Sequence, residues 1–333
     1  MKALFIGGTG NISNACSRLA LARGFDLSIL SRGKRSRSDL TDATFITADI
    51  NEARQIKEQL RGERFDVVVN FIAFSPAEVE RDIQLFSENC DQYIFISSAS
   101  AYQKPPSHPV ITESTPLSNP YWDYSRNKIA CEEVLMKAYR EKGFPVTIVR
   151  PSHTYETVIP VAIGSWEDFT IIDRMRKGGT VIIHGDGTSL WTITHSQDFA
   201  KGFVGLMGNQ QSIGHSFHIT SDELLNWNQI YQAVAEAAGA DLKAVHISSD
   251  FICEEADKIG QEWMRGNLMG DKANSAIFDN TKIKRLVPGY VATIPFREGI
   301  KRTVEWFDAH PDRIRIEDEN NRLMDAVLTA YGC

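Results

Sequence analysis

The sequence lacks the cysteine patterns that mark disulfide-rich and zinc-binding proteins. Its five cysteines are widely spaced and form neither a CxxC pair nor a Cys/His cluster at metal-ligand spacing: Cys16, Cys90, Cys131, Cys253 and Cys333. An odd, scattered set of this kind is typical of reduced thiols. We therefore expect no metal site and a cytoplasmic protein.

Long apolar runs and an excess of positive charge are also missing. The N-terminus, MKALFIGGTG, has only four consecutive apolar residues after Lys2, which is too few for the core of a signal peptide. No later run approaches the ~18 residues that cross a bilayer. The chain has 36 basic residues against 43 acidic ones, a net charge of −7, which disfavours a nucleic-acid partner. Secretion, membrane insertion and nucleic-acid binding are not expected.

What the chain does contain is an ordinary globular composition over 333 residues, 42% of them apolar, which is enough for about two domains. In the first 150 residues, strand-like runs alternate with amphipathic stretches. We predict strands at 3–6, 27–30, 44–47, 67–71, 93–96 and 146–149, and helices at 12–23, 52–61, 77–88 and 121–141. This alternation predicts an α/β fold, a doubly wound parallel sheet of the Rossmann type.

The alternation of strand-like and helix-like segments ends after residue 150, where longer irregular segments precede a helix-like stretch at 297–307. We therefore place a Rossmann domain at residues 1–150 and a smaller C-terminal substrate-binding lobe at 151–333, some of whose segments return to the Rossmann core. A lobe over the open edge of such a sheet is where ligands of this fold class are enclosed.

A glycine-rich turn follows the first predicted strand directly. It has a GxxGxxS spacing and comprises Gly7, Gly8, Thr9, Gly10, Asn11, Ile12 and Ser13. Glycine lets the backbone turn tightly and approach a pyrophosphate, and the following helix directs N–H groups at the phosphate charge. Ser13 replaces the usual third glycine, which serves helix packing. The turn predicts a dinucleotide-binding site.

The end of the second predicted strand carries basic residues and no acid. An NAD site of this kind places a carboxylate there to hold the ribose hydroxyls, whereas this chain has Ser31 and Arg32, followed by Gly33, Lys34 and Arg35. Arginine pairs bidentately with phosphate oxygens, as a 2′-phosphate requires. We predict NADP rather than NAD, with a solvated basic loop as the alternative interpretation.

Tyr124 and Lys128 stand four positions apart in a predicted helix, so both lie on one face. A phenol titrates near ~10, and a neighbouring ammonium favours its ionised form. Ser98 lies upstream at the end of a predicted strand, where the active site of a parallel sheet forms. Together the three side chains predict an acid–base site.

With these motifs the sequence resembles the short-chain dehydrogenase/reductase superfamily, in particular its extended branch of NAD-dependent epimerases and dehydratases, from Met1 to about Phe307. The resemblance implies that Tyr124 is the catalytic acid/base, that Lys128 anchors the nicotinamide ribose and tunes Tyr124, and that Ser98 orients the substrate. It also implies cofactor contacts by Asp49 and Ile50 at adenine, by Asn70, Phe71, Ile72 and Ala73 below the cofactor, and by Pro151, Ser152 and His153 beside the nicotinamide.

Two departures from that branch bear on the substrate. Where 4,6-dehydratases have an Asp-Glu pair, this chain has Ala99 and Ser100, and Trp191 replaces the arginine that grips a nucleotide-sugar diphosphate. The nearby basic residues 174, 176 and 177 suggest a solvated face. Ser98, Ser100, Trp191 and His195 are therefore candidates for contact with a substrate that has no diphosphate, and we expect Trp191 to face a flat, uncharged group.

The sequence is also similar to a subgroup that includes the chloroplast stem-loop-binding proteins, which are associated with RNA. The net charge, and a basic cluster confined to residues 32, 34, 35 and 37, argue against that role. Our first hypothesis is therefore an oxidoreductase or epimerase acting on a sugar or sugar-like substrate. The alternative is a non-catalytic NAD(P)-binding protein that contacts RNA or protein.

The resemblance further implies a homodimer through helices 77–88 and 121–141. The apolar residues Ile129, Val134, Leu135 and Tyr139 support this prediction.

Overall fold

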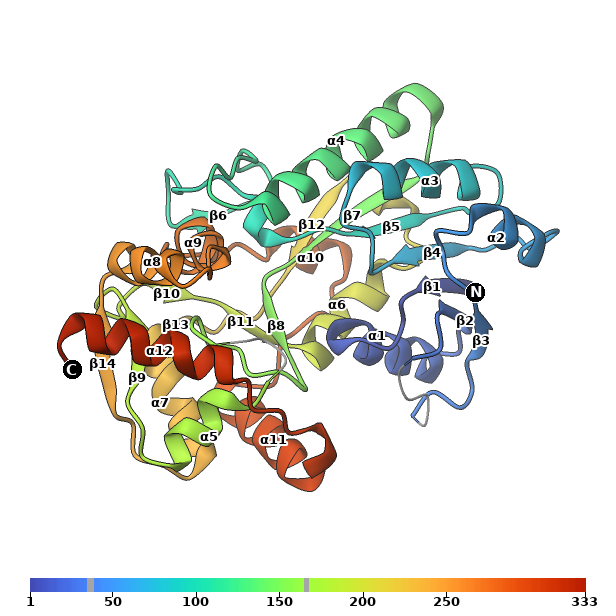
Figure 1. The fold of residues 1–333 in the computed structure, drawn as a ribbon. Coiled ribbons are helices and arrows are strands. Elements are labelled where there is room, and N and C mark those ends of the chain that lie inside the picture. Colours follow the sequence, from blue (N-terminus) through green and yellow to red (C-terminus); the bar gives the residue numbers. More distant parts are fainter. Residues whose placement is uncertain (35–38, 165–167) are drawn as a thin grey trace.

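A seven-stranded parallel sheet organises the computed structural model, which describes residues 1–34, 39–164 and 168–333 (Figure 1). Its strand order is β12-β7-β5-β4-β1-β2-β3, and every pairing is parallel. The strands are β1 (Lys2–Ile6), β2 (Asp26–Ser31), β3 (Thr44–Thr47), β4 (Val67–Asn70), β5 (Tyr93–Ile96), β7 (Val146–Pro151) and β12 (Ser216–Ile219). The predicted doubly wound fold is confirmed, and the order reverses direction between β1 and β4.

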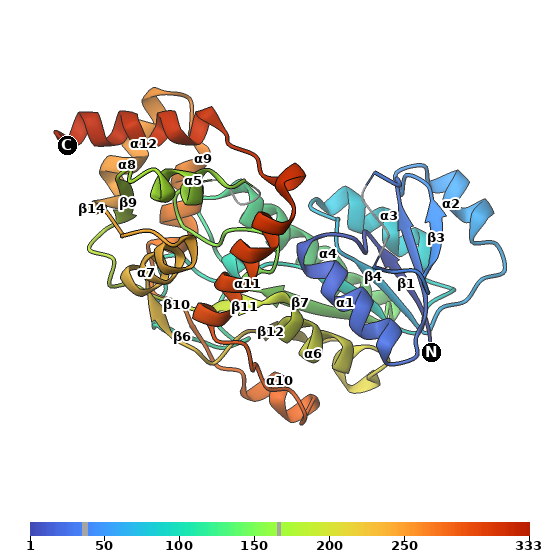
Figure 2. The same cartoon turned by 90° about the horizontal axis from the view of Figure 1, so that it is seen from below.

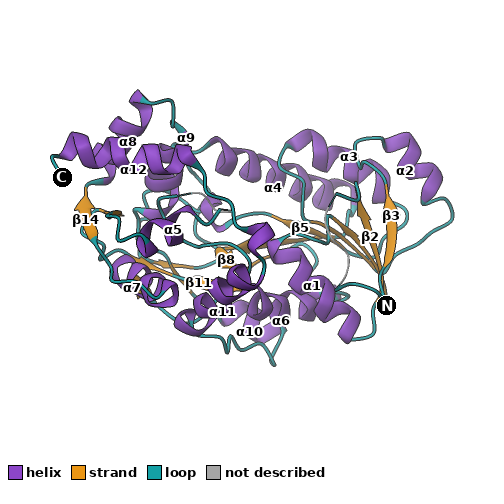
Figure 3. Ribbon diagram, turned by 60° about the horizontal axis from the view of Figure 1, so that its bottom comes forward, coloured by secondary structure: helices purple, strands orange, loops and turns teal. Residues whose placement is uncertain are grey.

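Helices cover both faces of this sheet (Figures 1 and 3). One face holds α2 (Ala53–Gln59), α3 (Pro76–Phe86) and α4 (Asp123–Lys142). The other holds α1 (Asn11–Ala22) and α6 (Ser196–Leu206). The four helices predicted in the first 150 residues are present within two residues at each end. Helix α4 ends at Gly143, whose φ of +68° gives the left-handed C-cap that its sequence predicts.

The last strand of the sheet and one of its covering helices come from beyond residue 150. Strand β12 pairs with β7, and α6 packs against α1. Gln92, which is buried just before β5, forms hydrogen bonds to the end of α6 and to the segment between α6 and β12. Its Nε2 donates to the carbonyl of Leu206 at 3.1 Å and to Ser212 at 2.8 Å, and its Oε1 accepts from Gly208 N at 2.7 Å.

The remaining elements form a group that we call the second lobe, beside one end of the sheet (Figure 2). Its core surrounds the fully buried Trp227. Its elements are α5 (Thr170–Arg176), β9 (Val181–His184), β10 (Leu190–Trp191), β13 (Leu225–Asn226), α7 (Trp227–Ala238), β14 (Ala244–Ile247), α8 (Ser249–Lys258), α9 (Trp263–Asn267), a π-helical turn (Leu268–Lys272), α11 (Phe296–Ala309) and α12 (Asp318–Tyr331). The sequence predicted mostly irregular segments here, with a helix that corresponds to α11 and one around residues 174–177 that corresponds to α5, so this part is more regular than expected.

Short strand pairs and one further helix connect the lobe to the sheet. Strand β8 (His153–Tyr155) continues from β7 and pairs in parallel with β11 (Ile193–His195). Strand β6 (Val110–Ile111) pairs with β15 (Ile277–Phe278), which precedes α10 (Thr281–Leu286). No helix in the described part of the chain is long and apolar enough to cross a membrane.

Candidate active site

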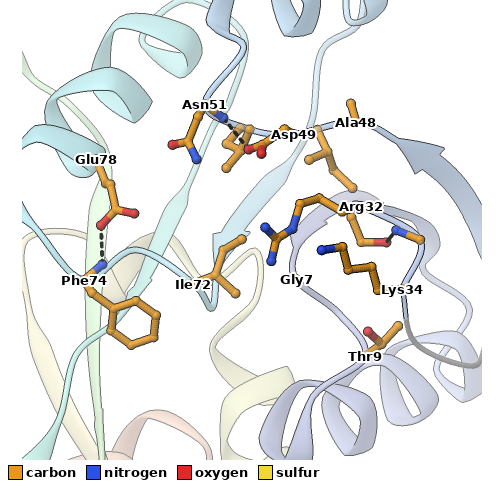
Figure 4. Close-up of a pocket in the computed structure, with 14 residues that line it drawn as sticks. Gly7, Thr9, Arg32, Lys34, Ala48, Asp49, Asn51, Ile72, Phe74 and Glu78 are labelled. Carbon is orange, nitrogen blue, oxygen red and sulfur yellow. Dashed lines mark hydrogen bonds between the residues drawn. The ribbon is translucent and has the colours of Figure 1, made fainter.

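A pocket of about 370 Å³ opens at the carboxyl ends of β1, β2 and β4, where the strand order reverses (Figure 4). This is the place where open α/β sheets bind ligands. The lining residues come from the glycine turn, the ends of β2 and β3, the loop after β4 and the first turn of α3: Gly7, Thr9, Leu30, Ser31, Arg32, Gly33, Lys34, Ala48, Asp49, Ile50, Asn51, Ile72, Phe74 and Glu78. Many of the predicted cofactor residues therefore share one cavity.

The glycine turn packs as its sequence predicts. Gly7 has a φ of +85°, and a Cβ at this position would lie only 2.5 Å from Cγ2 of Ile72, so only glycine fits. Ser13 accepts a hydrogen bond from Gly10 N at 2.8 Å and so caps the start of α1. Asn11 does not line the pocket, because its amide bonds to the carbonyl of Thr154 at 2.9 Å.

Two cations face this pocket. Arg32 and Lys34 point into it side by side (Figure 4), and neither forms an ion pair with any residue that the structure describes. Asp49 lies across the pocket and caps its own turn by accepting from Asn51 N at 3.0 Å. Arg35 and Arg37 of the predicted basic cluster lie outside the described residues. The end of β2 thus offers positive charge where an NAD site has a carboxylate.

The pocket walls fit a dinucleotide. Ile72 and Phe74 are 41% and 48% exposed although both are large and apolar, and a bound nucleotide would cover them. The first turn of α1 and the two cations suit phosphate groups. The residues present therefore match the group that the glycine turn predicts.

Two of the predicted cofactor residues direct their side chains into the core instead of the pocket. Phe71 packs against Phe5 and Phe203, with ring centroids 5.3 and 5.5 Å away. Asn70 donates to the buried carboxylate of Asp82 at 2.5 Å and accepts from Ile72 N at 2.7 Å. Their contribution is to hold the loop that carries Ile72 and Phe74.

Ser98 and Tyr124 meet at the carboxyl end of β5. The Ser98 hydroxyl lies 2.9 Å from the hydroxyl of Ser100, which accepts from Ser125 at 2.7 Å. Burial raises the pKa of Tyr124 to about 12, although the nearby Ser98 side chain opposes this shift. Tyr124 is therefore protonated at neutral pH.

Lys128 completes the group from the next turn of α4. Its Nζ donates to the carbonyls of Ala73 at 2.7 Å and Ile96 at 2.8 Å, and lies 5.8 Å from the ring centroid of Tyr124. Burial lowers the pKa of Lys128 to about 8. Phe74 links this group to the pocket, because its ring centroid lies 4.3 Å from Nζ and 6.2 Å from the Tyr124 ring centroid. The structure thus brings Ser98, Tyr124 and Lys128 together beside the pocket.

The other predicted residues are more deeply placed. Ser152 donates to the carbonyl of Thr192 at 3.2 Å, between the buried Pro151 and His153. Trp191 packs against Trp227 with ring centroids 5.8 Å apart. His195 accepts from Gln197 N and so caps α6.

Sequence reasoning missed several residues around Tyr124. The Trp122 ring centroid lies 5.0 Å from that of Tyr124. Asn119 donates both to the carbonyl of Ser100 at 2.8 Å and to that of Gly270 at 2.7 Å. Gly270 belongs to the π-helical turn, a distortion that is frequent at functional sites. Trp122 could have been noticed beside the Tyr124 motif, whereas no local signal marks Gly270.

The basic residues near Trp191 in the sequence are engaged elsewhere. Arg174 pairs with Asp325, Arg176 with Asp308 and Lys177 with Asp173. None of these three cations is directed at the group around Tyr124. The expected solvated face holds for Lys177, whose side chain is 73% exposed, whereas the Arg174 side chain is only 13% exposed.

Known proteins resemble this chain in sequence and in fold. The curated relatives include a chloroplast stem-loop binding protein of 41 kDa from Arabidopsis thaliana, 25% identical over 253 residues, covering 72% of this chain and 63% of that protein. A UDP-glucose 4-epimerase from Lactobacillus helveticus is 31% identical over 170 residues, covering 45% of this chain and 51% of that protein. The chain therefore spans between half and two thirds of the length of these two relatives.

Solved structures share the fold over nearly the whole chain. The dTDP-glucose 4,6-dehydratase DesIV from Streptomyces venezuelae, with NAD and TYD bound, has a TM-score of 0.73 at 21% identity and covers 95% of this chain and 99% of its own. The UDP-Glc/GlcNAc 4-epimerase from Campylobacter jejuni has a TM-score of 0.73 at 19% identity and covers 92% and 99%. Residues 3–220 match the sequence pattern of a single family. The chain belongs to the NAD dependent epimerase/dehydratase family.

Proposed function

We propose that the protein is a nicotinamide-dependent oxidoreductase or epimerase that acts on a hydroxyl-bearing or carbonyl carbon of a sugar or sugar-like substrate. The observation that carries this proposal is the meeting of Ser98, Tyr124 and Lys128 beside a pocket that fits a dinucleotide. A bound nicotinamide would supply hydride transfer at its C4 position. The relatives named as UDP-glucose 4-epimerase and dTDP-D-glucose 4,6-dehydratase support the substrate class.

The chain's own residues provide the proton chemistry. The Tyr124 hydroxyl gives a proton to a substrate carbonyl oxygen, or takes one from a substrate hydroxyl, while the Ser98 hydroxyl binds the same oxygen. With a pKa of about 12, the Tyr124 hydroxyl carries a proton at neutral pH that it can donate. Taking a proton requires the phenolate, which the nearby Lys128 ammonium favours.

Replacement of Tyr124 tests this role. Tyr124→Phe should lower turnover by about 10²–10⁴-fold, the usual contribution of a general acid–base group, while cofactor binding persists. Tyr121→Phe is the matched control, since Tyr121 lies just before the same helix and is exposed. Turnover is followed at the nicotinamide absorbance across free sugars, sugar acids and nucleotide sugars. Full activity of Tyr124→Phe on a substrate that the wild type accepts would contradict the assignment.

For the cofactor we propose NADP in preference to NAD. The support is the pair of cations, Arg32 and Lys34, that face the pocket at the end of β2. Arg32→Ala should weaken NADPH binding by about tenfold or more, the effect of one charge-assisted hydrogen bond, and leave NADH binding nearly unchanged. Arg54→Ala, at an exposed position of α2, is the control. Equal losses for both cofactors would remove the 2′-phosphate assignment.

The relative named for stem-loop binding favours a second candidate function, a non-catalytic protein that keeps the cofactor site and contacts RNA. Titration of the protein with an RNA stem-loop at several salt concentrations tests it. Specific contacts to several phosphates would give a steep salt dependence. With a net charge of −7, we expect weak binding that physiological salt abolishes.

Two further expectations belong to this proposal. All five cysteines are free thiols, which supports a reducing compartment and therefore a cytoplasmic location. The family resemblance supports a homodimer through α3 and α4.

A further inference from the structure

Two lysines are buried at the substrate end of the site, although neither was singled out in the sequence. The side chain of Lys104, on the loop after β5, is 1% exposed, and that of Lys272, at the end of the π-helical turn, is 9% exposed. Between them lies Asp271, with a side chain 14% exposed. A buried ammonium is costly unless opposite charge and hydrogen-bond acceptors surround it.

The partners of these lysines do not balance their charge. Lys272 Nζ donates to Oδ2 of Asp271 at 3.2 Å. Lys104 Nζ lies 3.9 Å from Oδ1 of the same carboxylate, which is too far for a hydrogen bond, and no other residue that the structure describes accepts from it. Two cations thus share one carboxylate. Burial lowers the pKa of Lys104, an effect that Asp271 opposes and Lys272 reinforces.

A second unsatisfied donor lies beside Lys104. Its Nζ is 5.6 Å from the ring centroid of Trp191, and the buried indole Nε1 of Trp191 has no hydrogen-bond partner among the residues described. Buried N–H groups in folded proteins are nearly always paired. An excess positive charge and two open donors in one place therefore point to an absent acceptor that carries negative charge.

This place adjoins the proposed reacting group. Trp122 lies between them, with its ring centroid 5.0 Å from that of Tyr124 and 5.9 Å from Lys272 Nζ. Asn119 ties the π-helical turn to the loop of Ser100 through the carbonyl of Gly270. The charge of Asp271 also acts on Tyr124, contributing to its raised pKa.

We propose that Lys104 and Lys272 hold one anionic group of the substrate, a carboxylate or a phosphate, with the Trp191 indole as a further donor. This inference rests on the proposed function, because it takes the Ser98–Tyr124 end of the site as the place of the substrate. It replaces the sequence-based expectation of an uncharged group at Trp191. The cations come from segments that the sequence does not link to Trp191, and lysine binds phosphate and carboxylate as a point charge.

The test uses anion binding by the full chain, so that it needs no turnover. Inorganic phosphate and acetate are titrated while tryptophan fluorescence is followed, because Trp191 lies beside Lys104. Lys104→Met and Lys272→Met should each weaken the response by about tenfold or more. Lys177→Met, at a 73% exposed lysine, and Arg54→Ala, at an exposed position of α2, should leave it unchanged. Glucose 1-phosphate and glucuronate, compared with glucose, then distinguish a phosphate from a carboxylate.

Two further measurements distinguish effects on folding and on the proposed function from effects on anion binding. Lys104→Met should be at least as stable to urea as the wild type, because it removes a buried charge without a hydrogen bond. Tyr124→Phe should bind phosphate and acetate like the wild type. Anion binding that depends on Lys104 without any hydride transfer would remove the proposed function and leave an anion site at Lys104 and Lys272 standing. The absence of a saturable response to either anion at millimolar concentration, or an unchanged response in Lys104→Met, overturns the inference.

Discussion

Lys128 keeps its ammonium group with only 1% of the residue exposed to solvent, between the carbonyl groups of Ala73 and Ile96. Two neutral acceptors replace only part of the hydration that the charge loses, and no carboxylate among the described residues bonds to the ammonium group. When it is charged, Lys128 therefore destabilises the fold, whereas in our proposal the same charge favours the Tyr124 phenolate.

The pH dependence of the free energy of unfolding should reveal the destabilising effect of the buried Lys128 charge. The pKa of Lys128 is about 8 in the folded protein and about 10.4 in an unfolded chain, so between these values the unfolded chain binds more protons and stability rises with pH. Below pH 8 the full penalty applies, on the order of 3 kcal/mol. The stability advantage of Lys128→Met over the wild type should thus be largest near pH 7 and shrink toward pH 10 in urea titrations. A constant difference across this range would contradict the expectation.

Asp82 is a structural counterpart of Lys128 on the same side of the sheet. Its buried carboxylate accepts from Tyr93 at 2.6 Å, from Asn70 at 2.5 Å and from Arg81 at 2.8 Å. Asp82→Ala leaves these donors without their acceptor and should lower the free energy of unfolding by about 3 kcal/mol. Asp91→Ala breaks an exposed pair with Arg64 and should cost below about 1 kcal/mol. Equal effects in chemical denaturation would show that Asp82 has no special role.

Residues with a local pattern could be predicted from the sequence, and residues without one could not. Gly7 belongs to a turn whose glycines have a fixed spacing, and Tyr124 and Lys128 share a helix face through its period of 3.6 residues. Asp82 bonds to Asn70 and Tyr93, which belong to the neighbouring strands β4 and β5. Lys104 and Lys272 meet only because Lys104 lies beside Asp271, far away in the chain. Their roles depend on which strands become neighbours, and no single-sequence pattern contains that information.

At the scale of elements, helix α9 and the π-helical turn are closely fitted to the start of α4. Gly266 of α9 is in contact with Trp122, which in turn packs against Tyr124. A Cβ at Gly266 would lie 2.4 Å from Cδ1 of Trp122. This contact fixes one wall of the site through a residue that has no side chain.

Gly266→Ala should therefore displace Trp122 and disturb the site. We expect a loss of about 1–3 kcal/mol in stability from overpacking and a changed tryptophan emission spectrum. Gly289→Ala is the matched control, because a Cβ there would meet no atom within 4 Å. If both variants had the wild-type spectrum and stability, the proposed fit between α9 and α4 would be wrong.

The elements of the two halves differed in how well they could be predicted. The long amphipathic helices such as α1 and α4 alternate with buried strands, and this repeated pattern fixes their type. In the second lobe the helices α5 and α9 have seven and five residues, which is too short for a clear period. Strands such as β10 and β13 have two residues each and depend on pairing across the lobe.

At the scale of the whole molecule, the homodimer stays a prediction that rests on the family resemblance. The apolar residues that supported it pack within the chain itself, since Leu135 is buried in the core with Val134 and Tyr139 against it. The outward positions of α3 and α4 include Glu80, Gln84 and Lys137, which are exposed and polar. Any interface through these helices would be largely polar and sensitive to salt.

Light scattering at micromolar concentration tests the assembly. A dimer should give twice the mass of 37.3 kDa, and its fraction should fall as salt increases, because surface ion pairs are screened. Glu80→Lys combined with Lys137→Glu measures whether these exposed positions contribute. A monomer at all salt concentrations would refute the dimer.

The buried amide of Gln92 has a consequence for the order in which the protein can fold during synthesis. When residue 150 leaves the ribosome, six of the seven strands have been made, but the segment that bonds to Gln92 and the strand that covers the edge of β7 have not. Until about residue 219 is available, the nascent sheet exposes an unpaired edge and the part of one apolar face that α6 later covers. The first half of this chain must therefore wait for the second, and during that interval its exposed strand edge and apolar surface make it prone to aggregation.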